Sequence, residues 1–181
     1  MGRIKEPEPA KLFMSLFTSE ENLFQQGMET FRPLFGEIDF VSERLPFPFT
    51  DYYQEEMGGP LYRHFITFER LISRVLLSEI KQTTNRLEGQ FANGQGNRRL
   101  NIDPGYLSLE HVILATTKNY THRPYPKDGI YADLTLIYRN KSYQPLEWTY
   151  PDYRQTGVIE LFNQFRMKYL EDLRKKESRL C

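Results

Sequence analysis

The residues best suited to chemistry lie on two strands that the sequence predicts as neighbours, residues 110–119 and 129–139. Alternation along the second strand puts Tyr131, Asp133 and Thr135 on one face. A charged aspartate in the middle of a strand costs free energy unless it is exposed or paired. This polar face is therefore either a binding surface or an ordinary solvent-facing sheet surface with salt bridges.

Lys118 lies near the end of the first of these strands, and two further polar side chains, His122 and Arg123, follow just beyond it. If the polar faces of the hairpin align, they lie on one surface with Asp133. Lys118 and Arg123 would then hold a phosphate or carboxylate group, because charge-assisted hydrogen bonds to such anions are strong. Asp133 and His122 are the candidates for proton transfer to or from the bound ligand.

A second carboxylate, Asp103, begins an Asp-Pro-Gly sequence that predicts a turn after a short strand, residues 98–102. Together with Asp133 it would hold Mg²⁺ through oxygen ligands or act as a base. Arg98 and Asn101 precede it and are expected to contact the ligand. Mg²⁺ is the one cofactor that this pattern suggests.

Residues 148–154 place three aromatic side chains, an acid and a base just before the last predicted helix. Trp148 and Tyr150 are suited to stacking on a base or sugar ring, with Asp152 fixing its polar edges. The same segment fits a structural corner equally well, in which Asp152 caps the final helix.

A polar stripe of Lys81, Asn85 and Glu88 lies on a predicted helix, residues 76–91, at spacings of four and three. Such a stripe is usually a solvated helix face, but here it would add a further wall to the ligand site. The apolar face of this helix is expected to hold Ile80 and Leu87.

Composition and missing motifs exclude several classes of function. The formal net charge of zero argues against a protein that coats DNA or RNA. The sequence contains no P-loop, no glycine-rich dinucleotide motif and no paired metal-binding cysteines. Its one cysteine, Cys181, and the lack of an apolar signal region favour a cytoplasmic protein that does not enter a membrane.

The predicted element order is β-α-β-β-α-β, followed by an antiparallel β meander and a C-terminal helix at residues 156–177. Its first strand is the apolar run at residues 11–18, preceded by a frayed arm at residues 1–9. The 181 residues fit a single domain. The expected fold is α+β with a ferredoxin-like core and helices largely on one face of the sheet.

Several segments together resemble a bacterial family of about this length that is known only as a domain of unknown function. The resemblance implies a stand-alone bacterial protein and brings no activity, cofactor or catalytic residue. The segments that carry it are Phe49-Thr50-Asp51-Tyr52-Tyr53, Glu56-Met57-Gly58, Lys81 with Thr84-Asn85 and Glu88, Asn101 to Leu107, Leu114 to Lys118, His122-Arg123, Gly129 to Ala132, and Trp148 to Arg154.

Two functions follow as expectations from these residues. The first is an enzyme or sensor that acts on a small anionic or phosphorylated ligand, such as a nucleotide with Mg²⁺. The second is a non-catalytic module that binds RNA or a protein, because a ferredoxin-like sheet with exposed aromatic rings can stack single-stranded bases. The zero net charge weakens the RNA alternative.

Overall fold

A computed structural model describes residues 2–48 and 52–178 of the chain. Its central strand, β1 (Ala10–Thr18), is buried at every position, so the predicted apolar first strand is confirmed. It pairs antiparallel with β4 (Tyr62–Ile72) on one side and with β5 (Leu100–Leu107) on the other. The preceding arm lacks regular structure, but Tyr169 donates to the carbonyl oxygen of Pro9, which holds its end.

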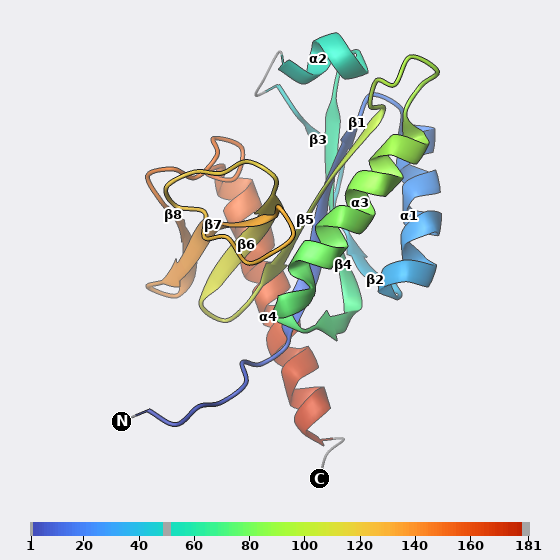
Figure 1. Cartoon of the computed structure of the whole chain (residues 1–181). Helices are drawn as coiled ribbons and strands as arrows, with labels where there is room; N and C mark the ends of the chain where they lie inside the picture. Colours follow the sequence, from blue (N-terminus) through green and yellow to red (C-terminus); the bar gives the residue numbers. More distant parts are fainter. Residues whose placement is uncertain (1, 49–51, 179–181) are drawn as a thin grey trace.

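One antiparallel sheet contains all the strands of the described residues (Figure 1). Its order is β2 (Ile38–Val41), β4, β1, β5, β6 (His111–Thr116), β7 (Tyr131–Arg139) and β8 (Ser142–Pro145), and β3 (Leu45–Pro46) also pairs with β4. The predicted α+β class with an antiparallel sheet is confirmed at this level.

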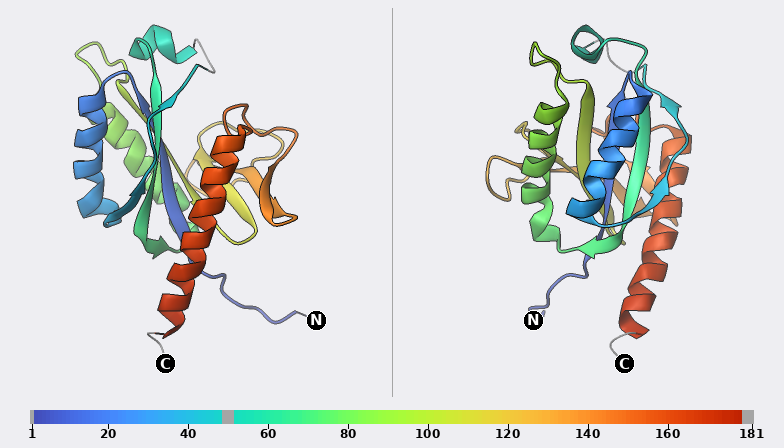
Figure 2. Two further views of the ribbon diagram at one scale, coloured as in Figure 1. Left: turned by 180° about the vertical axis from the view of Figure 1, so that it is seen from behind. Right: turned by 90° about the vertical axis from the view of Figure 1, so that its right-hand side faces the viewer.

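The helices cover both faces of the sheet, as Figure 2 shows. On one face, α1 (Glu21–Phe35) and α3 (Leu77–Phe91) bury side chains against β1, β4 and β5. A 3₁₀ turn, Arg74–Leu76, leads into α3. On the other face, α4 (Thr156–Ser178) packs a stripe that includes Phe162 and Phe165 against Phe13 and Phe65. The expectation of helices largely on one face is therefore wrong for α4.

A short helix, α2 (Tyr52–Met57), lies in the segment from Phe49 to Gly58, most of which contributes to the family resemblance. The first residues of that segment, Phe49 to Asp51, lie outside the described residues. Within the described part of the chain, no helix has the length and apolar character needed to cross a membrane.

The sheet splits between β5 and β6, because β6 pairs with β5 only from Gly105 to Leu107. The predicted turn at Asp103 is wrong, since this sequence lies inside β5. Gly105 is needed for close approach, because a Cβ atom there would lie 2.5 Å from the carbonyl oxygen of Ile113. Pro104 has no N–H to offer β6, which explains why pairing stops at this point.

A second irregularity alters the faces of β7. The pairing of β6 with β7 skips a residue, so that Val112 lies opposite Leu136 but Ile113 lies opposite Leu134. Leu134 therefore packs near Leu77 of α3, whereas Leu136 belongs to the core under α4. The strict alternation predicted for residues 129–139 is broken by this bulge.

Candidate functional site

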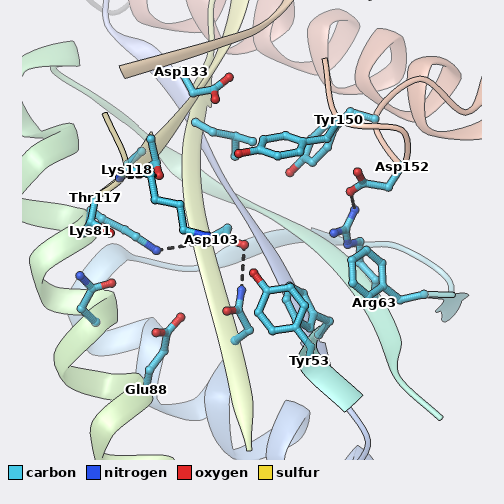
Figure 3. Close-up of a pocket in the computed structure, with 18 of the residues that line it drawn as sticks. Tyr53, Arg63, Lys81, Glu88, Asp103, Thr117, Lys118, Asp133, Tyr150 and Asp152 are labelled. Atoms are coloured by element: carbon cyan, nitrogen blue, oxygen red, sulfur yellow. Dashed lines mark hydrogen bonds and ion pairs between the residues drawn. The ribbon is translucent and has the colours of Figure 1, made fainter. Parts of the chain in front are cut away.

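A cavity of about 570 Å³ lies where β5 and β6 separate (Figure 3). Its sides come from α3, from β5, from the end of β6 and the residues after it, and from the loop between β8 and α4. Aromatic residues near the end of β1 and from α2 complete it. The size is in the usual range of small-molecule sites.

The side formed by α3 carries Lys81, Asn85 and Glu88 on one face of the helix. Lys81 Nζ donates to the carbonyl oxygen of Ile102 (3.1 Å) and to Asp103 Oδ1 (3.2 Å). Glu88 Oε1 accepts the backbone N–H of Ile102 (2.6 Å). Lys81 and Glu88 therefore provide hydrogen-bond partners for the backbone C=O and N–H of Ile102, which β6 does not pair with. Both side chains are buried, so they are not part of a solvated stripe.

The α3 side also keeps unused hydrogen-bonding capacity. An ammonium group has three donors, and Lys81 uses two of them on protein acceptors. Within residues 2–48 and 52–178, neither Glu88 Oε2 nor the Asn85 carboxamide has a hydrogen-bond partner. These groups are available to a ligand in the cavity.

Glu88 changes charge near neutral pH. Burial raises its pKa to about 7, the nearby ammonium group of Lys81 opposes this shift, and the carboxylate of Asp103 reinforces it. A carboxyl group with such a pKa in a ligand-sized cavity is suited to proton transfer.

The floor of the cavity is the bare part of β5, where Asn101 and Asp103 face inward. Asn101 Nδ2 donates to Asp103 Oδ2 (2.8 Å), and Arg98 Nη1 donates to Asn101 Oδ1 (3.1 Å). Arg98 also binds both carboxylate oxygens of Glu56 in α2 (2.9 and 2.6 Å). This contact lowers the pKa of Glu56 and raises that of Arg98. The carboxylate that holds Arg98 was not foreseen.

The side opposite α3 is closed by a buried ion pair between Arg63 of β4 and Asp152. The guanidinium of Arg63 also lies 4.2 Å from the ring centre of Phe47 and 5.5 Å from that of Tyr153. The side chain of Asp152 binds Arg63 and makes no cap for α4, so the structural-corner prediction is wrong on this point. Arg63 was missed in the sequence analysis. It carries the same signal that identified Asp133, a charged side chain within a strand of alternating residues.

Asp133 lines the cavity, but protein groups already occupy both of its carboxylate oxygens. Arg123 Nε donates to Oδ2 (2.7 Å), and the Thr135 hydroxyl donates to Oδ1 (3.1 Å). Arg123 Nη2 also donates to the hydroxyl of Tyr150 (2.5 Å). Asp133 is 2% exposed, so the alternative of a solvent-facing surface is wrong here. Its arrangement is that of a residue that positions Arg123.

His122, Arg123, Tyr131 and Trp148 lie outside the cavity lining. The His122 ring stacks on Trp148, with ring centres 4.9 Å apart and an angle of 13° between planes. Trp148 Nε1 donates to the carbonyl oxygen of Leu134 (2.8 Å). His122 Nε2 lies 3.4 Å from Asp133 Oδ2. His122 and Trp148 thus contact residues of β7, and Tyr131 packs against Tyr125, with ring centres 5.3 Å apart.

The cavity thus brings together most of the residues singled out from the sequence, and it adds aromatic residues that were missed. The predicted residues that line it are Lys81, Asn85, Glu88, Arg98, Asn101, Asp103, Lys118, Asp133, Tyr150 and Asp152. The residues that were missed include Phe17, Phe47, Tyr53, Arg63 and Tyr153.

The carboxylates do not form a metal centre in this arrangement. Across the described residues, no group of three or more His, Cys, Asp or Glu side chains is placed to hold a metal ion. Asp103 and Asp133, the pair expected to hold Mg²⁺, accept hydrogen bonds from Lys81 and Arg123 respectively. A magnesium ion would need further oxygen ligands from the bound molecule.

Comparison with protein families identifies the relationship that the sequence motifs indicated. The chain belongs to the family described as Domain of unknown function (DUF4416), which matches residues 8–169. Comparisons with curated proteins and with solved structures find no match. The residues and geometry of the cavity are therefore the basis for a proposed function.

Proposed function

We propose that this member of the family binds a small ligand with an anionic or phosphorylated group in the cavity between α3 and β5. The observation that carries the proposal is Lys81. This lysine is 6% exposed, yet one of its three donors has no acceptor among the described residues, and it lines the cavity. A ligand oxygen is a suitable third acceptor.

The charge balance of the cavity supports an anionic ligand. Each of the three arginines around it is paired with a carboxylate: Arg63 with Asp152, Arg98 with Glu56 and Arg123 with Asp133. The other charged side chains of the lining are two lysines, Lys81 and Lys118, and two carboxyl groups, Asp103 and Glu88.

Protonation of Glu88 decides whether these four side chains carry a net positive charge or none. Below pH 7 most of Glu88 is neutral, because its pKa is raised to about 7. The cavity then carries an excess positive charge, which favours an anion. Glu88 is also the group best suited to act on a bound ligand, ahead of the predicted catalytic residues Asp103, His122 and Asp133. Its Oε2 accepts no hydrogen bond from the described residues.

Thermal-shift screening with nucleotides and sugar phosphates, with and without Mg²⁺, tests the proposal. At least one phosphorylated compound is expected to raise the melting temperature of the wild-type protein. Lys118→Gln, which removes an exposed cation from the lining, should weaken this effect. The matched control is Lys127→Gln, because Lys127 lies outside the lining and pairs with Glu79 (2.8 Å). If no phosphorylated compound stabilises the protein, the proposal is wrong.

RNA binding is a second candidate, favoured by the exposed rings of Tyr120, Tyr125 and Trp148. They lie on the two segments joined by the hydrogen bond between Arg123 and Tyr150. Such rings can stack on unpaired bases. Salt-dependent retention of the protein on single-stranded RNA, lost in Trp148→Ala, is the expected result for this candidate. A cavity of small-molecule size gives it less support than the small-ligand proposal.

We also infer that the first half of the fold follows the ferredoxin-like plan. The support is the strand order β2, β4, β1, β5, with α1 and α3 on the same face. On this plan, β6 to β8 form the added meander. A bacterial origin and a cytoplasmic location stay predictions from the sequence.

A further inference from the structure

We propose that the ligand is a nucleotide whose base stacks on the ring of Tyr150 while its phosphate is held at Lys81 and Lys118. This inference rests on the proposed function and names the class of ligand. The evidence is that the two sides of the cavity differ. The side with Tyr53 and Tyr150 is aromatic, and the α3 side is rich in hydrogen-bonding groups.

The aromatic side offers a ring that is both exposed and fixed. Tyr150 is 39% exposed, as expected of a side chain that a ligand can still cover. Its hydroxyl accepts a hydrogen bond from Arg123 Nη2 (2.5 Å), and Arg123 is held by Asp133 (2.7 Å). The ring therefore needs little further ordering when a planar group stacks on it.

A second ring extends the aromatic side. Tyr53 of α2 lines the same cavity and packs edge-on against Phe17, with ring centres 4.8 Å apart. Figure 3 shows Tyr53 and Tyr150 pointing into the cavity from the side away from α3. A planar group of the size of a base thus finds aromatic surface in two places.

The α3 side offers the polar groups that a nucleotide needs. Lys81 has a donor to spare, and the carboxamide of Asn85 has no partner among the residues described, so it can both donate and accept. Lys118 supplies a second ammonium group at the exposed end of the lining. In Figure 3, Lys81 and Lys118 lie together on the side of α3, across the cavity from Asp152. The ring contacts and the phosphate contacts lie on different sides of the cavity. This arrangement fits a long ligand with a planar ring at one end and a phosphate at the other better than it fits inorganic phosphate.

Isothermal titration calorimetry with AMP and with ribose 5-phosphate, which lacks the base, tests this inference. AMP is expected to bind the wild-type protein at least about tenfold more tightly, the contribution of one stacked base. Tyr150→Leu should reduce AMP binding to about the level of ribose 5-phosphate and leave ribose 5-phosphate binding unchanged. Tyr150→Phe, which keeps the ring and loses the contact with Arg123, should retain most of the preference for AMP.

Two controls separate this inference from the proposal beneath it. Tyr125→Leu alters an exposed tyrosine outside the lining and should change neither affinity. Lys118→Gln should weaken both ligands alike. If ribose 5-phosphate binds as tightly as AMP, or if Tyr150→Leu preserves the difference, the nucleotide inference fails and the anion-binding proposal stands. If neither compound binds while another phosphorylated compound does, the nucleotide inference fails alone. If no phosphorylated compound binds, both fail.

Discussion

Two lysines, Lys11 and Lys81, are buried in the same fold but in opposite kinds of surroundings. Lys11 in β1 is 0% exposed and binds two carboxylates, Asp39 (2.5 Å) and Asp172 (2.6 Å). Lys81 in α3 is 6% exposed and binds one carboxylate and one backbone carbonyl, at 3.2 and 3.1 Å. Lys11 lies in a closed cluster that joins β1, β2 and α4, whereas Lys81 lies in the cavity wall.

The difference shows why burial alone does not identify a functional charge. The contacts of Lys11 are short and are reinforced by Lys168 and Thr67 on the same Asp39. Each lysine donates to two protein acceptors, so the difference lies in where they are: Lys81 has one carboxylate partner and lines the cavity, whereas Lys11 has two and does not. We therefore assign Lys11 to stability and Lys81 to binding.

The largest effect is expected for Lys11→Met. Removing this fully buried ammonium group takes away the cation that Asp39 and Asp172 share and leaves Asp39 only its longer ion pair with Lys168 (3.4 Å), which should cost about 3–5 kcal/mol of unfolding free energy. Urea denaturation followed by circular dichroism measures this loss. The double variant Lys11→Met with Asp172→Asn should recover part of it. A loss below about 1 kcal/mol would show that the cluster is not a structural one.

The pH dependence of stability should report Glu88. Its pKa is raised to about 7 in the folded protein from an ordinary 4.5. The folded state therefore holds a proton that the unfolded state has already released between these values. Stability from this group is fully present below pH 4.5 and is lost as the pH rises through 7. The total is about 3 kcal/mol, because one pKa unit corresponds to about 1.4 kcal/mol.

Glu88→Gln isolates this contribution, since glutamine keeps an oxygen to accept the N–H of Ile102. Unfolding free energies of the wild type and the variant, measured from pH 5 to 8, should diverge as the pH rises. If the two curves of unfolding free energy against pH stay parallel, Glu88 does not titrate between pH 5 and 8. It would then no longer be a candidate for proton transfer.

The smallest effect is expected for Lys127→Gln. Lys127 is exposed, and its ion pair with Glu79 lies at the surface. Such pairs contribute little, so the midpoint of urea denaturation should stay the same as in the wild type. Ligand affinity should also stay unchanged. A clear loss of binding in this variant would extend the ligand site beyond the cavity.

The sequence predicted the elements well where one pattern dominates. The apolar run of β1 and the C-terminal helix α4 were both recognised, because apolar residues recur along the chain with the period of a strand or a helix. The Asp-Pro-Gly sequence in β5 was misread, since proline and glycine indicate turns but also permit a sheet to split and two strands to approach closely.

The cavity was predicted only in part, because its geometry depends on partners that are distant along the chain. Asp152 was a candidate, but its partner Arg63 lies 89 residues away and was missed. Lys81 and Glu88 look like a solvated stripe until the bare edge of β5 at Ile102 is known. No local pattern shows where β6 leaves that edge.

Calorimetric titration of AMP and ribose 5-phosphate into Lys81→Met tests the central claim most directly. Circular dichroism and urea denaturation should first show that the variant folds. We expect the wild type to bind at least one of the two compounds and Lys81→Met to bind it at least about tenfold more weakly. Unchanged affinity in a folded Lys81→Met protein would contradict the assignment of Lys81 to anion binding.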